Sequence, residues 1–223
     1  MQGVLRRPSR AFLRIKKDSN MKKTTLALAM GLMISGAANA ALEANIGATS
    51  NYLWRGVTQN GDKASISGGI DYSAENGIYA GVWTASLDGS SEIDYYAGFS
   101  GEADSVGYDL GYIYYSYTTG ADDFAEVYGN VTVSGITAGI ALQVDQQGTD
   151  YNKKYYSLSK DFELTDGFGL TATAGKYDGD GAGDWSHLTL DVTKDDFTFS
   201  LSKAGSGSGD DSVIPYVSYS KTF

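Results

Sequence analysis

The stretch "ITAGIALQV", residues 136–144, decides the fold of this chain. Every second residue in it is apolar, and the residues between are small or polar. Strict alternation over this length is typical of a β-strand with one apolar and one polar face, because successive side chains point to opposite sides. The same period recurs at residues 42–49, 64–71 and 187–192. After residue 41 we find no 3.6-residue period of an amphipathic helix, so we expect an all-β protein.

Segments of this kind fill the chain after residue 41. Each is close to the roughly 9–11 residues that a transmembrane strand needs. Their number is even, which brings both termini to the same rim. The first and last strands can then pair and close the antiparallel sheet into a barrel of about twelve strands. The predicted strands are 42–55, 64–73, 78–87, 92–101, 106–117, 124–133, 136–145, 153–162, 168–177, 185–193, 197–204 and 214–223.

The connections between these strands sort by length. The short ones are 74–77, 102–105, 134–135, 163–168 and 194–196, and the longer ones are 57–63, 118–123, 145–152, 178–184 and 205–212. The connection at 88–91 is short and breaks the trend. Short periplasmic turns at one rim and longer extracellular loops at the other are typical of outer-membrane barrels. Since even the longer loops are modest, we do not expect a loop folded into the lumen.

The two faces of the strands indicate which side meets lipid. An apolar face turned to lipid leaves a polar, wet interior, and aromatic residues near strand ends fit the aromatic belts of membrane interfaces. Continuing the alternation from Leu42 puts Tyr52 and Trp54 of "SNYLWRGVTQN" (residues 50–60) on the lipid face. We therefore predict these two as interface anchors, with Arg55 turned into the lumen.

We expect the first forty residues to lie outside the folded barrel. "MKKTTLALAMGLMISGAANA", residues 21–40, has two lysines, an apolar run and an A-x-A end, which is the pattern of a cleaved secretory signal peptide. Residues 1–20 form an upstream extension, for which a start codon assigned too early is the simplest interpretation. The barrel is expected at residues 41–223.

Composition excludes several function classes. Residues 41–223 hold 9 basic and 26 acidic residues, a net charge of −17. Nucleic acid is therefore not an expected partner, because affinity for phosphate backbones rests on Lys and Arg. The chain has no Cys, which excludes disulfides and thiol chemistry. The expected partners are outer-membrane lipid and lipopolysaccharide, and no cofactor is expected.

The sequence ends in "VIPYVSYSKTF", residues 213–223. Val217, Tyr219 and Phe223 share one face, and an aromatic end on a final amphipathic strand resembles the targeting signature of bacterial outer-membrane proteins. We expect this strand to be recognised by the barrel-assembly machinery, with Phe223 as a further interface anchor.

The chain resembles the TorF-type porins of proteobacteria. The resemblance rests on the export signal, on Tyr52-x-Trp54-Arg55-Gly56-x-Thr58-Gln59 after an acidic first strand, and on repeated "GxYxG"-like strands. It covers essentially the whole of residues 41–223. It implies an outer-membrane β-barrel and names no solute.

Acids outnumber bases among the residues expected to face the lumen. A ring of carboxylates in a water-filled lumen favours cations over anions. Eight-stranded barrels are filled and 16–18-stranded ones leave a channel, so twelve strands fit either a narrow pore or a lumen filled by its own side chains. For Arg55, an ion pair across the lumen is the alternative to a contact with solute. The candidate pore-lining residues are Glu43, Arg55, Asp71, Glu92, Asp94, Asp109, Glu126, Asp161, His187 and Asp191.

Enzymatic and metal sites have weak support. His187 is the sole histidine and stands in no Ser-based motif, so we expect a lumen-facing polar residue and no enzyme. "DGDGAGD", residues 178–184, places Asp178, Asp180 and Asp184 like part of a calcium loop but lacks the closing Glu. We expect acidic surface loops there, with weak cation association at most.

The function that these observations favour is an outer-membrane porin-like barrel for small cationic or neutral solutes. Two alternatives stay open: a barrel with a structural or envelope-interaction role and no transport, and a soluble exported barrel that binds an apolar ligand inside, as lipocalins do. The last needs the apolar face of the strands to point inward.

Overall fold

The computed structural model describes residues 40–146, 153–179 and 183–223. Twelve strands form one closed antiparallel barrel, as the alternation predicts. The predicted extension at 1–20 and all but the last residue of the signal peptide at 21–40 lie outside the described residues. The barrel strands are β1 (Ala40–Thr49), β4 (Ser65–Ala74), β5 (Ile78–Leu87), β6 (Ser90–Ala103), β7 (Val106–Tyr117), β8 (Phe124–Val133), β9 (Ile136–Gln146), β10 (Lys154–Glu163), β11 (Phe168–Asp178), β12 (Trp185–Lys194), β13 (Phe197–Ala204) and β14 (Val213–Thr222).

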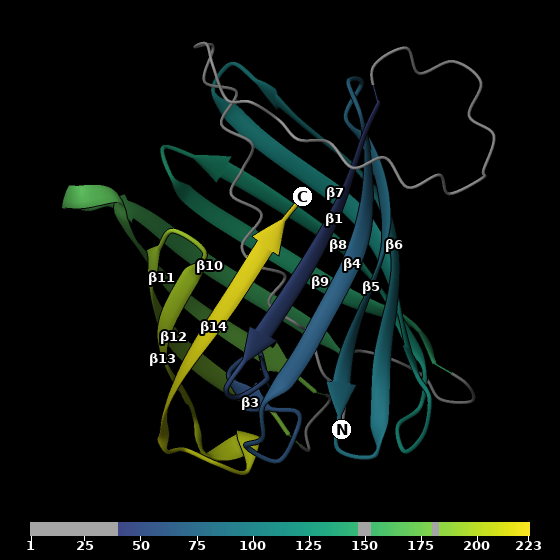
Figure 1. The fold of residues 1–223 in the computed structure, drawn as a ribbon, viewed down its shortest axis with the longest axis vertical. Coiled ribbons are helices and arrows are strands. Elements are labelled where there is room, and N and C mark those ends of the chain that lie inside the picture. The colour runs from purple at the N-terminus through teal and green to yellow at the C-terminus, as the bar shows by residue number, and fades with distance from the viewer. Residues whose placement is uncertain (1–39, 147–152, 180–182) are drawn as a thin grey trace.

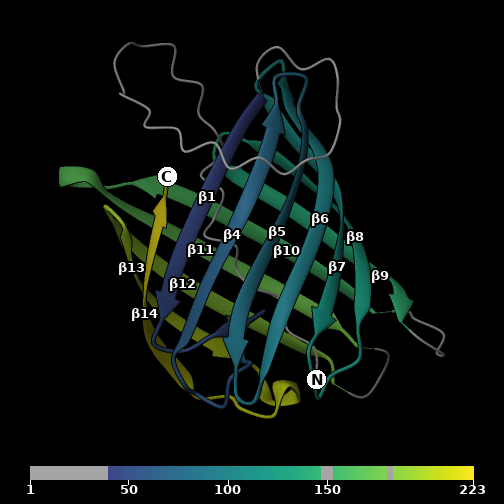
Figure 2. The same ribbon diagram turned by 45° about the vertical axis from the view of Figure 1, so that its right-hand side comes forward.

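Each barrel strand pairs with its neighbours in sequence, and the first and last strands close the ring (Figures 1 and 2). β1 pairs with β4 on one side and with β14 on the other, where Gly47 lies opposite Ser220. Closure leaves no barrel strand with an unpaired edge, which is what a sheet in hydrocarbon requires. Within the described residues no helix is both long and apolar enough to cross a bilayer.

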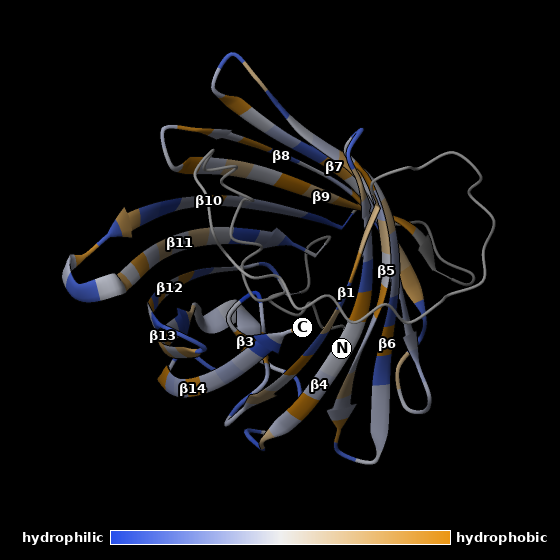
Figure 3. Ribbon diagram, turned by 45° about the horizontal axis from the view of Figure 1, so that its top comes forward, coloured by the Kyte–Doolittle hydropathy of each residue, from blue (hydrophilic) through white to orange (hydrophobic). Residues whose placement is uncertain are grey.

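The apolar face of the strands is the outer face. Exposed apolar side chains cover it, and stripes of apolar and polar residues alternate along the strands in Figure 3. The inside combines buried polar side chains with a cluster of aromatic ones. A lipocalin-like binding barrel needs the apolar face of the strands to point inward, and in the described barrel that face points outward. Examples of the outward side chains are Ile46, Ile66, Leu110, Val127, Ile140, Leu158, Leu188, Phe199 and Val217.

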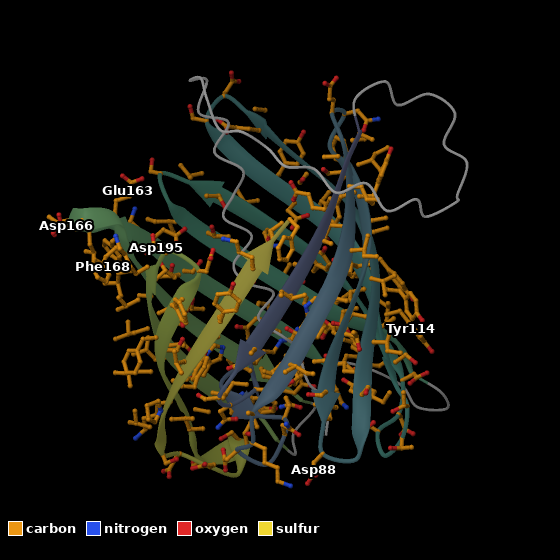
Figure 4. All side chains as sticks on the ribbon, in the orientation of Figure 1. Asp88, Tyr114, Glu163, Asp166, Phe168 and Asp195 are labelled. Carbon is orange, nitrogen blue, oxygen red and sulfur yellow. The ribbon has the colours of Figure 1, made fainter. Side chains whose placement is uncertain are left out.

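The two rims differ in their connections. The rim that holds both ends of the barrel carries tight turns, such as Asp104–Ser105 and Ser134–Gly135, where φ is positive at both residues as type I′ hairpin turns require. The opposite rim carries the connections at 118–123 and 205–212, and the latter includes the short 3₁₀ turn η2 (Ser206–Ser208). In Figure 4, Asp88 marks this loop rim and Asp195 the turn rim. Among the described connections, the loops at 118–123 and 205–212 follow the predicted sorting by length, and the connection at 88–89 is a short exception on the loop rim, as the sequence indicates.

The first strand is shorter than predicted. β1 ends at Thr49, and the chain then turns into the barrel, where β2 (Leu53–Trp54) pairs with β3 (Val57–Thr58). We call residues 50–63 the inner hairpin. Its side chains from Asn51 to Arg55 are all buried, and β3 lies within the ring of strands in Figure 3. The expectation that no loop enters the lumen is therefore wrong.

Candidate functional site

The predicted lumen residues of the strands all lie on the inner face. Residues paired across neighbouring strands point to the same side of the sheet. Glu43 pairs with Asp71, and Asp94 pairs with Tyr115, so these residues share the inner face. Glu92, Asp94, Glu126, His187 and Asp191 are buried, Asp71 and Asp109 are half-buried, and Glu43 and Asp161 are exposed. Whether these residues line an open pore stays a prediction.

The inner hairpin is tied together by its own polar side chains. The Asn51 amide donates to Asp62 Oδ1 at 2.8 Å, and Thr58 Oγ1 donates to Asn51 Oδ1 at 2.9 Å. The backbone N–H of Asp62 donates to Thr58 Oγ1 at 3.0 Å. These bonds pair polar groups at the base of the hairpin, where the chain leaves the barrel wall.

Arg55 stands at the tip of the inner hairpin. It has φ of 47° and Gly56 has φ of 84°, so a two-residue turn links β2 to β3. Positive φ is uncommon for residues other than Gly, Asn and Asp, and such outliers gather at functional positions. An ideal Cβ at Gly56 would stand 2.6 Å from His187 Cβ, which shows how closely the tip approaches β12.

The guanidinium of Arg55 crosses the lumen to the opposite wall. Its Nη2 donates to Glu126 Oε2 at 2.8 Å, and the two side chains are 4% and 5% exposed. Tyr115 also donates to Glu126 Oε2, at 3.3 Å. The expected ion pair across the lumen is therefore present. Its partner on β8 is one of the carboxylates that the alternation predicts to face inward.

Tyr52 links the start of the inner hairpin to the barrel wall. Its hydroxyl donates to Glu92 Oε1 at 2.9 Å, and its ring lies 6.4 Å from that of Trp83. Burial, and then the nearby Glu92 and Asp94 carboxylates, raise the pKa of Tyr52 well above its usual value. The phenol therefore stays protonated and remains a donor.

Trp54 packs against other strands of the wall than Tyr52 does. Its ring meets Tyr177 at 5.2 Å and Trp185 at 6.0 Å, both edge-on. Trp185 Nε1 in turn donates to the backbone oxygen of Arg55 at 2.9 Å. These contacts fix the hairpin against β11 and β12.

The prediction that Tyr52 and Trp54 anchor the barrel at the lipid interface is wrong. Each is 2% exposed and lies inside the ring. Alternation continued past Thr49 fails because the backbone leaves the sheet there, and the interior offers aromatic partners for both rings. Phe223 lies beside the middle of β1, exchanging backbone hydrogen bonds with Ala44, and is 48% exposed. Its anchoring role stays a prediction.

Two cavities remain around the inner hairpin. The larger has a volume of about 390 Å³, and the smaller about 130 Å³. Leu53 of the inner hairpin and Thr171 and Tyr216 of the wall border both, so the two cavities adjoin at these residues. Arg55, Asp94, Asp109, Glu126 and Asp161 all border the larger cavity.

His187 takes part in a hydroxyl network. Its Nε2 lies 2.8 Å from Tyr155 Oη, and its Nδ1 lies 3.3 Å from Thr189 Oγ1. Thr189 Oγ1 is in turn 2.9 Å from Ser202 Oγ. Ser200 Oγ on β13 also donates to Asp191 Oδ1 at 2.7 Å, so the interior face of β12 and β13 carries both hydroxyls and a carboxylate.

The acidic loop gives no metal site within the described residues, where no group of three or more His, Cys, Asp or Glu side chains is placed to hold an ion. Asp184 Oδ1 accepts the N–H of Gly179 at 2.8 Å and so closes a turn of its own loop. Asp178 is the last residue of β11, and Asp180 lies outside the described residues.

Sequence reasoning missed the aromatic lining of the interior. Trp83, Tyr115, Phe124 and Tyr177 are buried inside, and Tyr155 shares their side of the wall. The signal is available, because Tyr155 has the same strand parity as Asp161, which the alternation places inside. The interface pattern concerns only the aromatic residues near strand ends.

Comparison with protein families gives one match. A family model described as "Bacterial protein of unknown function (Gcw_chp)" matches residues 34–211. The chain belongs to the Gcw_chp family. No curated protein sequence matches the chain. The TorF-type resemblance is not part of this match and stays an expectation.

The descriptions of solved structures similar to this Gcw_chp chain name porins and membrane proteins. "KdgM porin" has a TM-score of 0.56 at 7% identity, over 79% of this chain and 98% of that one. "KdgM porin in complex with disordered oligogalacturonate" has a TM-score of 0.50 at 7% identity, over 82% and 96%. A chain described as "Unveiling the Mechanism Behind the in-meso Crystallization of Membrane Proteins" has a TM-score of 0.57 at 10% identity, over 82% and 83%. At such identities the likeness concerns the fold alone.

Proposed function

We propose that this protein is a narrow outer-membrane channel of the TorF type, which lets small cationic or neutral solutes diffuse across the membrane. The single observation that carries the proposal is the closed barrel with an apolar outer face and an interior that holds buried polar side chains and cavities of about 390 and 130 Å³. An apolar outer face suits lipid, and a polar interior suits water and hydrophilic solutes.

The charge of the interior supports a preference for cations. The larger cavity is bordered by four carboxylates, those of Asp94, Asp109, Glu126 and Asp161, and by one guanidinium, that of Arg55. Since Arg55 is paired with Glu126, the remaining carboxylates set the sign of the local field. Carboxylates around a water-filled passage favour cations over anions.

The similar porin structures support a channel function for this chain, but they do not support the same solute. One of them was solved with oligogalacturonate, an acidic sugar oligomer. The carboxylates that border the cavity of the present chain would repel such a solute. We therefore infer a channel function from these neighbours, but we do not infer that the present chain binds oligogalacturonate.

A second candidate function has an observation in its favour. The inner hairpin fills part of the lumen, and Tyr52 and Trp54 pack there as tightly as core residues, each 2% exposed. A filled lumen suits a barrel that serves the envelope as a structural or interaction protein. The two candidates differ in whether ions pass.

Planar-bilayer recording separates them. The refolded protein, shown to be folded by its heat-dependent gel mobility, is added to a lipid bilayer in KCl. The channel proposal expects small discrete current steps, absent from the same preparation after boiling. Folded protein that inserts and gives no current above background would overturn the proposal and favour the structural role.

A further inference from the structure

The guanidinium of Arg55 sits in a cage of aromatic rings closed by a carboxylate. Its Cζ lies 4.3 Å from the ring centre of Trp54, 4.1 Å from that of Tyr155 and 5.5 Å from that of Tyr177. Glu126 accepts its hydrogen bond at 2.8 Å. Rings within about 6 Å of a cation attract it through their quadrupole, and aromatic cages with an acid recognise organic cations.

Most of this cage belongs to the barrel wall and not to the inner hairpin. Glu126 lies on β8, Tyr155 on β10 and Tyr177 on β11, where Tyr155 and Tyr177 are register partners. Trp54 is the one ring that comes from the hairpin. The wall residues would therefore keep their arrangement when the side chain of Arg55 is absent.

Arg55 occupies the cage with part of its hydrogen-bonding capacity unused. Among the described residues, its Nε and Nη1 have no hydrogen-bond partner, although the side chain is 4% exposed. Its backbone has φ of 47°, which a non-glycine residue rarely adopts. A side chain that is incompletely bonded and held on a strained turn is a replaceable occupant.

The cage opens onto the larger cavity. Arg55, Glu126 and Tyr155 all border this space of about 390 Å³, which also touches Asp94 and Asp109. A solute in the cavity would therefore meet the carboxylate of Glu126 and the face of Tyr155 from the same side. The surplus of carboxylates there would raise the local concentration of cations.

We propose that Glu126, Tyr155 and Tyr177 form a binding site for organic cations that carry a guanidinium or alkylammonium group, and that Arg55 is its built-in occupant. A solute of this class binds by exchanging with the Arg55 side chain. The inference rests on the proposed function, because the solute has to reach the cage through the lumen. It adds to that function a class of solute and a place where the solute pauses.

Replacing the occupant tests the site. Arg55→Gly removes the side chain and suits the positive φ of the turn, and guanidinium chloride at low millimolar concentration supplies the lost group as the probe. Trp54 and Trp185 flank the cage, so their fluorescence in detergent reports binding. We expect a saturable change in R55G, with affinity at least about tenfold higher than in the unmodified protein, where Arg55 competes.

Three matched controls define the chemistry. Urea has nearly the shape of guanidinium without its charge and should give no saturable change. Sodium chloride at equal ionic strength should also give none. The double variant R55G/E126Q should bind guanidinium about tenfold more weakly than R55G, because the charge-assisted bond is lost. Equal responses to guanidinium and urea, or no loss in the double variant, would overturn the inference.

The measurement is independent of transport. Saturable guanidinium binding in R55G with no channel current would overturn the proposed function and leave the site standing. Channel current without saturable guanidinium binding would overturn the binding site and leave the proposed function standing. If R55G does not fold, Arg55→Asn is the second variant, because Asn tolerates positive φ and its short side chain leaves the cage vacant.

Discussion

Tyr52 and Glu92 are joined inside the barrel by a hydrogen bond of 2.9 Å, which ties the inner hairpin to β6. Glu92 is fully buried, and its other oxygen, Oε2, has no hydrogen-bond partner among the described residues. The side chains of Tyr52 and Tyr117 both hydrogen-bond this carboxylate. The pair explains why a residue expected at the membrane surface lies inside.

Tyr52→Phe should destabilise the folded barrel by about 1–3 kcal/mol, because a buried carboxylate loses one of its donors while the ring packing is retained. The midpoint of thermal unfolding, followed by gel mobility, should fall. Tyr112→Phe is the matched control, since Tyr112 lies on the outer face and is 43% exposed. Equal midpoints for Y52F and the unmodified protein would show that the hydrogen bond does not hold the hairpin.

Arg55→Gly should loosen the inner hairpin and raise single-channel conductance. It leaves Glu126 buried without its cation, and breaking one side of a buried pair typically costs about 3–5 kcal/mol. Lys63→Gln is the control, because its ion pair with Asp88 is 59% and 68% exposed and worth about 1 kcal/mol or less. Unchanged conductance in R55G would mean that the hairpin does not set the width of the passage.

Gly56→Ala should destabilise the protein more than Gly89→Ala. Both glycines have positive φ, 84° and 73°, so both variants incur a backbone cost of roughly 1–2 kcal/mol. At Gly56 the new methyl also meets His187 Cβ at 2.6 Å, whereas at Gly89 nothing lies within 4 Å. Thermal midpoints of the two variants measure the difference. A larger loss in G89A would contradict the close packing of the hairpin tip on β12.

The barrel itself could be predicted from the sequence because its signal is local and repeated. Each strand alternates, and Asp94, Asp109 and Asp191 fall on the inner face by parity alone. The inner hairpin could not be predicted in the same way. Alternation predicts the side that a residue faces only while the chain stays in the sheet. β1 ends at Thr49, and the sequence around Thr49 gives no signal that the chain leaves the sheet there.

The aromatic residues show the same limit. Tyr52 and Trp54 suit a membrane interface and a packed interior equally well, since each has an apolar ring and a polar tip. Their place follows from partners far along the chain, namely Glu92 for Tyr52 and Tyr177 for Trp54. Arg55 is similar: an inward direction could be inferred, but its cage of Tyr155 and Tyr177 depends on how strands β10 and β11 are arranged around the hairpin.

Charge selectivity tests the central claim most directly. The reversal potential of the channel is measured across a KCl gradient for the unmodified protein and for Asp109→Asn and Asp161→Asn, which remove charges bordering the larger cavity. The account predicts a reversal potential of cation-selective sign, reduced in both variants. An anion-selective reversal potential in the unmodified protein, or one that both variants leave unchanged, would contradict it.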